Sequence, residues 1–178
     1  MELIRSERDT FRLTIRGHAL IDEGLDSLLA DAFVDKKIPG FLKGPTFKRK
    51  LELGLALGLI PPSLKEPIDR LSALRDKMAH GRISEVSRTQ ALEVFASVTA
   101  VVPSLEEIRE SDDSMEPRYF LSLAIFVIWS ALANAEQAAR ERREAIDAAL
   151  SRAELSPIAV AILQQQLDDA RAGKAAEG

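Results

Sequence analysis

The sequence contains no cysteine and only two histidines, and both shortages limit the chemistry available to it. Without thiols the chain has no disulfide, no thiolate nucleophile and no cysteine-bound metal, which fits a reducing cytoplasm. With His18 and His80 alone, one subunit cannot supply a histidine-rich metal site, so we expect neither metal nor cofactor. Sequence patterns for a nucleophile elbow, a phosphate-binding loop, a dinucleotide fingerprint and a zinc-protease helix are also missing.

Aromatic residues are scarce as well, at 5% of the chain, whereas Ala, Leu, Glu and Arg are common. This composition favours helices over strands, and no segment shows convincing strand alternation. With 46% hydrophobic and 29% charged residues, the chain has a globular profile. We therefore predict an all-α bundle of about six helices, with a helical domain over residues 1–110. Further helices over residues 117–178 are expected to pack on that bundle or extend it.

One segment is long and free of charge: Tyr119 to Ala135 holds 17 residues without a charged side chain. Seventeen is the short limit for a membrane-spanning helix, and the segment continues directly into charged residues. The first nine residues are rich in charged side chains and lack the apolar stretch of a signal peptide. We interpret the segment as a helix in a protein core or a dimer interface and expect no membrane association.

Capping residues and turns predict where the helices begin and end. The first helix is predicted from an N-cap at Ser6 to about Phe33, with Gly17 and Gly24 on one face where another helix can approach. Its apolar positions recur at spacings of three and four: Phe11, Ile15, Leu25, Leu28, Leu29 and Phe33, with Ile21 between. The later helices are predicted from Thr46 to Leu57, from Ser63 or Pro67 to His80, from Ser87 or Thr89 to Val102, from Pro117 to Leu150, and from Pro157 to Ala172.

A basic stretch, Lys36 to Lys50, covers the loop after the first predicted helix and the start of the second. It has no acidic residue, although the whole chain has 28 acidic and 24 basic residues. Such a patch either positions RNA through its phosphates or is simply a solvated loop, and both interpretations stay open. The basic residues of this stretch are Lys36, Lys37, Lys43, Lys48, Arg49 and Lys50.

The predicted helix that ends before Gly81 brings Arg75, Asp76 and His80 to its C-terminal end. An arginine fork suits phosphate oxygens, and a histidine exchanges protons near neutral pH. Together they can help an RNA 2′-hydroxyl attack its own phosphate without metal or thiol. His18, in the middle of the first predicted helix, is given no role.

The spacing between Arg75 and His80 restricts this hypothesis. Five residues on an α-helix correspond to a rotation of about 140°, so one helix does not direct both side chains to one point. A two-fold dimer would bring two copies of each residue to one cleft across the axis. The structural alternative is a histidine that is a favourable cation at the helix C-terminus, with Arg75 paired to a carboxylate. Spacing alone favours that alternative.

The stretch Arg75-Asp-Lys-Met-Ala-His80 resembles the Arg-x(4–6)-His motif of the HEPN superfamily. The preceding segment, from Gly44-Pro-Thr-Phe to Gly-Leu-Ile60, is similar to the mannitol-operon-repressor-like branch of that superfamily, in the same order along the chain. Many HEPN proteins are dimeric, metal-independent ribonucleases of the toxin or defence type. The resemblance therefore implies a HEPN-like fold and a site made of Arg75, Asp76 and His80.

The resemblance leads to two expectations about function. The first is a cytoplasmic homodimer that binds or cleaves RNA through a shared Arg75/Asp76/His80 cleft, with an antitoxin or regulatory protein as partner. The second is a non-catalytic regulatory dimer of the repressor-like kind, which acts through protein contacts. A weaker third interpretation is a structural subunit whose long helix after Tyr119 docks on another protein.

Overall fold

The computed structural model describes residues 9–32, 46–111, 115–152 and 165. Across these residues it is all-helical, with six α-helices, two short 3-10 helices and no strand. The predicted all-α class is confirmed. Two compact units divide the chain at Glu141 and Arg142, and the core described below belongs to the first unit, Met1–Glu141. This unit extends beyond the helical domain predicted over residues 1–110.

Helix α2 (Thr10–Ala32) begins immediately after Asp9. The Asp9 carboxylate accepts a hydrogen bond from the backbone N–H of Phe11 at 2.8 Å, and so satisfies one of the free donors of the first turn. The predicted cap, Ser6, lies outside the described residues. A second polar contact ties this end to the fold, since the Thr10 hydroxyl accepts a hydrogen bond from the Val86 backbone N–H at 3.2 Å.

The buried face of α2 agrees with the predicted apolar positions at Leu25, Leu28 and Leu29 and differs from them near the N-terminus. Phe11 was placed on that face and is exposed, so this part of the prediction is wrong. Gly17 lies in the middle of the true buried face, and because glycine has no apolar side chain it interrupts the pattern that periodicity detects. The buried face consists of Thr10, Leu13, Thr14, Gly17, Ile21, Leu25, Leu28 and Leu29.

Helix α3 (Phe47–Ala56) follows Thr46, which has the extended backbone of an N-cap but makes no side-chain capping bond. The helix ends at Leu57, and Gly58 adopts a positive φ of 66°, as a glycine after a helix commonly does. Both predicted ends of this helix are confirmed within one residue. Helix α3 packs against α2.

A 3-10 turn (Pro62–Leu64) leads into helix α4 (Lys65–Ala79), which packs between α2 and α5. His80 is its C-cap, and Gly81 adopts a φ of 66°. The backbone N–H groups of Gly81 and Arg82 then bond to the carbonyls of Met78 and Lys77, which is the Schellman arrangement. The predicted glycine stop is confirmed. The buried residues of α4 are Pro67, Ile68, Leu71, Leu74 and Met78.

Helix α5 (Arg88–Thr99) is capped by Ser87 in a reciprocal capping box with Gln90. After a 3-10 turn (Pro103–Leu105), the short helix α6 (Glu106–Ser111) packs on α5. The longest helix, α7 (Pro117–Arg152), begins at the proline that the sequence indicates. The helix predicted from Pro157 lies outside the described residues.

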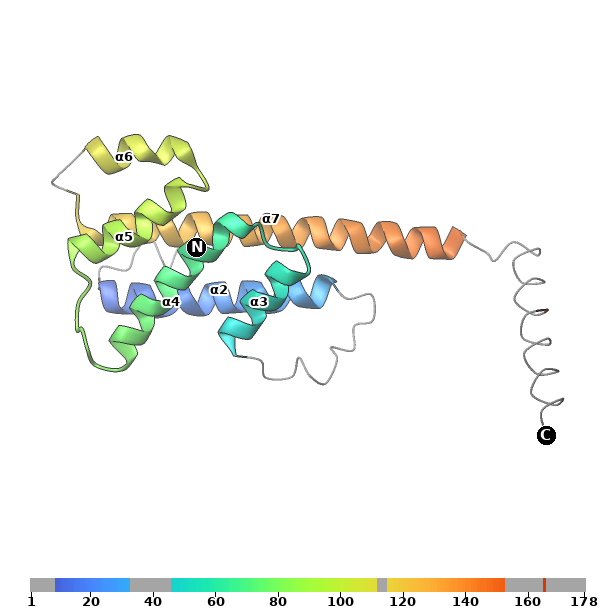
Figure 1. The fold of residues 1–178 in the computed structure, drawn as a ribbon, viewed down its shortest axis with the longest axis horizontal. Coiled ribbons are helices and arrows are strands. Elements are labelled where there is room, and N and C mark those ends of the chain that lie inside the picture. Colours follow the sequence, from blue (N-terminus) through green and yellow to red (C-terminus); the bar gives the residue numbers. More distant parts are fainter. Residues whose placement is uncertain (1–8, 33–45, 112–114, 153–164, 166–178) are drawn as a thin grey trace. The chain divides into compact units, whose positions relative to one another are not determined.

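Helices α2 and α7 lie side by side (Figure 1). A Cβ on Gly17 would come within 2.4 Å of the Ile125 Cδ1 atom, and a Cβ on Gly24 would lie 3.6 Å from the Leu132 Cδ1 atom. The predicted close helix approach is confirmed at Gly17, whereas the position of Gly24 would leave room for a methyl group. The buried side of α7 consists of Phe120, Leu121, Ala124, Ile125, Ile128, Leu132 and Ala139.

Among the described residues, α7 is also the one helix long and apolar enough to cross a membrane, judged by length and composition alone. In its most apolar 18-residue stretch, 33% of the residues are buried inside the protein. Core helices of soluble proteins pass the same test, so the observation is weak evidence of membrane association.

Candidate functional site

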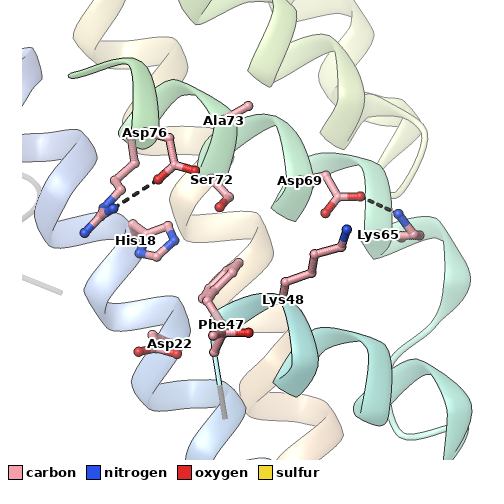
Figure 2. A pocket seen from close by; sticks show the side chains of 11 residues that line it. His18, Asp22, Phe47, Lys48, Lys65, Asp69, Ser72, Ala73 and Asp76 are labelled. Carbon is pink, nitrogen blue, oxygen red and sulfur yellow. Dashed lines mark hydrogen bonds and ion pairs between the residues drawn. The ribbon is translucent and has the colours of Figure 1, made fainter. Parts of the chain in front are cut away.

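A pocket of about 640 Å³ opens between α2, α3 and α4, and it contains two of the three predicted catalytic residues (Figure 2). Arg75 and Asp76 reach it from α4, together with Lys65, Asp69, Ser72 and Ala73. Its opposite side is formed by residues of α2 and the start of α3: His18, Asp22, Thr46, Phe47 and Lys48. A pocket of this volume falls in the range of small-molecule and nucleotide sites.

Arg75 is half-buried at the end of this pocket, and its guanidinium is bound by its neighbour in the sequence. The Nη1 atom of Arg75 donates to Oδ1 of Asp76 at 3.0 Å. An exposed ion pair of this kind contributes little stability, but it restricts the orientation of the guanidinium. The remaining N–H donors of the fork are therefore presented from a restrained side chain.

His80 lies elsewhere, because it does not line this pocket and its side chain is exposed. Its position follows from the helix geometry, since the C-cap comes about 140° around the axis from Arg75. The structure therefore brings Arg75 and Asp76 to one pocket within a single chain and leaves His80 outside it. The Schellman turn at Gly81 fixes the backbone on which His80 stands.

His18, to which the sequence gives no role, lines the pocket together with Arg75. It is half-buried, and its ring stacks on Phe47 with 4.2 Å between ring centroids and 33° between the planes. Burial, followed by the positive charge of Arg75, lowers the pKa of His18 below its usual value of 6.5, although Asp22 and Asp76 act in the opposite direction. No local signal in the sequence identifies His18, because α2 and α4 meet only through tertiary packing.

The residues of the basic stretch fall into three groups. Lys36, Lys37 and Lys43 lie outside the described residues. Lys48 lines the pocket and Arg49 is exposed on the same helix. Both side chains are exposed to solvent.

Lys50, by contrast, is buried against α2 with only 9% of its side chain exposed. Its Nζ atom donates to Oδ1 of Asp22 and to Oδ2 of Asp26, at 2.7 Å each. Burial alone would lower the pKa of Lys50, but the hydrogen bonds and charges of the two carboxylates outweigh it and raise the pKa. Lys50 therefore joins α3 to α2 and so supports one wall of the pocket.

The charges around the pocket are balanced. Lys65 pairs with Asp69, Arg75 pairs with Asp76, and Lys48 Nζ lies 4.0 Å from Glu52 Oε1. Figure 2 shows the first two pairs as dashed lines along α4. A ligand phosphate would therefore compete with carboxylates that already contact these cations. These exposed pairs are individually weak, and Arg75 keeps further N–H donors besides the one that Asp76 accepts.

In the part of the chain that the structure describes, no group of three or more histidine, aspartate or glutamate side chains is arranged to hold a metal ion. Comparison with protein-family models, with curated proteins and with solved structures found no match for this chain.

Proposed function

We propose that this protein is an RNA-directed, HEPN-like protein that acts as a metal-independent endoribonuclease. The observation that carries the proposal is that Arg75, held by Asp76, opens onto a pocket with a histidine and two lysines. Arg75 supplies the stabilising cation for the phosphorane, and cleavage by a 2′-hydroxyl also requires a group that moves protons.

In the proposed reaction, Arg75 binds a non-bridging oxygen of the scissile phosphate, and Asp76 keeps the guanidinium oriented. Lys48 and Arg49 contact neighbouring phosphates of the RNA strand. His80 takes part as a proton donor or acceptor from a second copy of the chain, because in its own chain it does not line the pocket. The proposed enzyme is therefore a homodimer.

The balanced charge of the pocket favours a second candidate, a non-catalytic regulator that acts through protein contacts. Three carboxylates line the pocket, together with three cationic side chains. The carboxylates are Asp22, Asp69 and Asp76, and the cations are Lys48, Lys65 and Arg75. Such a pocket has no net attraction for a polyanion when His18 is neutral. A polar peptide segment with both charges would suit it equally well.

One experiment separates the two candidates. Purified protein is incubated with end-labelled single-stranded RNA in EDTA, and a DNA of the same sequence serves as the substrate without a 2′-hydroxyl. The endoribonuclease leaves 2′,3′-cyclic phosphate ends on RNA and does not cut DNA. The Arg75→Gln variant should lose about 100-fold in rate, the scale of one lost transition-state donor.

Arg70→Gln is the matched control, because Arg70 lies on the same helix, pairs with Glu66 and does not line this pocket. Its rate should equal that of the wild type. RNA that stays intact with the wild-type protein in EDTA would remove the endoribonuclease and leave the regulator.

A further inference from the structure

The pocket already contains a histidine and an arginine from one chain. His18 on α2 and Arg75 on α4 line it together, and the charge of Arg75 acts on His18. His18 is also held in place, since its ring stacks on Phe47 at the start of α3. Figure 2 shows the His18 ring between α2 and α4, directed to the side of the pocket where Asp76 lies.

We infer that the scissile phosphodiester lies in this pocket within one chain, where His18 accepts the proton of the attacking 2′-hydroxyl. The inference rests on the proposed endoribonuclease function and adds the base that this function requires. The 2′-oxygen forms a bond to phosphorus as its proton passes to the imidazole of His18. The bond from phosphorus to O5′ then breaks, and O5′ leaves with a proton from water or from a second histidine.

The electrostatic surroundings suit a base. Because burial and Arg75 lower the pKa of His18, its imidazole is neutral at neutral pH and able to accept a proton. The proton that it gains is then close to Asp22 and Asp76, both of which favour the charged form. The charged groups that face the pocket are Asp22 on α2, Lys48 on α3, and Lys65, Asp69, Arg75 and Asp76 on α4.

His18 and His80 are the only two histidines in the chain, so variants at these positions test the inference directly. His18→Phe keeps an aromatic ring against Phe47 but cannot accept a proton. His18→Ala opens space in which added imidazole can replace the missing ring. We expect His18→Phe to lose at least 100-fold in cleavage rate, and imidazole to restore cleavage by His18→Ala. Purely structural loss would not be restored by imidazole.

Subunit mixing tests whether the two residues act in the same chain. When Arg75→Gln and His18→Phe subunits are refolded together, every pocket in a mixed dimer lacks one of the two residues, so no activity should return. If the two residues met across a dimer axis, one of two sites in each mixed dimer would be complete, and about one quarter of wild-type activity would return.

The outcomes separate the two levels of the proposal. Inactive His18→Phe, rescue of His18→Ala by imidazole and no complementation would support the inference. Wild-type cleavage together with an active, folded His18→Phe variant, or complementation by mixing, would overturn the inference while leaving the endoribonuclease in place. The helical circular dichroism of each variant shows whether it is folded. A wild-type protein that does not cleave RNA would overturn both.

Discussion

The ring of His18 stacks on the ring of Phe47, with their centroids 4.2 Å apart. The two residues lie on different helices, α2 and α3, and the contact holds His18 at the pocket that Arg75 enters from α4. Aromatic contacts of this kind contribute about 1 kcal/mol beyond the area they bury. The position of the imidazole therefore depends on how α3 is attached to α2, which leads to the first prediction.

Lys50→Met should lower the free energy of unfolding by about 2 kcal/mol. Methionine keeps most of the apolar stem in place, but the charged hydrogen bonds to Asp22 and Asp26 are lost. Lys48→Met is the matched control on the same helix, since Lys48 is exposed and its change should stay within about 0.5 kcal/mol. Urea denaturation measures both. Equal stability of the two variants would contradict the structural position given to Lys50.

Gly17→Ala should destabilise the protein by about 1–2 kcal/mol, whereas Gly24→Ala should be neutral or stabilising. The new methyl group at position 17 would overlap Ile125, a buried β-branched residue with little freedom to move. At position 24 the nearest atom, on Leu132, is at an ordinary contact distance, so the helix propensity of alanine prevails.

Thermal unfolding of the two glycine variants provides the comparison. Shortening the opposing side chain in the double variant Gly17→Ala/Ile125→Val should recover part of the loss, because valine lacks the Cδ1 atom that the new methyl group would meet. A Gly17→Ala variant as stable as Gly24→Ala would show that α2 and α7 are not in close contact at this point.

His18 should make stability depend on pH below about 6.5. Its pKa is lower in the folded state than the usual value of 6.5, so the unfolded chain binds a proton that the folded chain resists. Well above pH 6.5 the imidazole is neutral in both states, and the difference in pKa has no effect on stability. As the pH falls towards the folded-state pKa, the stability of the wild type should decrease. The stability of the His18→Phe variant should decrease less over the same interval. Urea midpoints of both proteins from pH 7.5 to 5 measure this difference.

The helix ends could be predicted from the sequence because they are set by residues near one another in the chain. Gly58 and Gly81 end helices with positive φ, Ser87 caps the next one, and Pro117 begins α7. The glycine that receives Ile125 was also indicated by its spacing from Gly24. Each of these signals works within one or two helical turns.

The pocket could be predicted only in part. The spacing of Arg75 and His80 correctly shows that one helix does not aim both side chains at one place. His18 lines the same pocket as Arg75 but comes 57 positions earlier in the sequence, and nothing local to it indicates that position. The sequence does not distinguish Lys50 from its basic neighbours, because its burial between two aspartates depends on the packing of α3 against α2.

The contact between α2 and α7 has a consequence for the surface of the protein. Gly17 and Gly24 are seven residues apart, as are Ile125 and Leu132, so the two helices meet at matching intervals. Because Ile125 fills the space that a side chain at position 17 would occupy, the rotation of α7 about its own axis is fixed. Tyr119 and Phe126 therefore stay exposed, at 51% and 43%. The missing side chain at position 17 of α2 therefore determines which aromatic rings α7 displays to solvent.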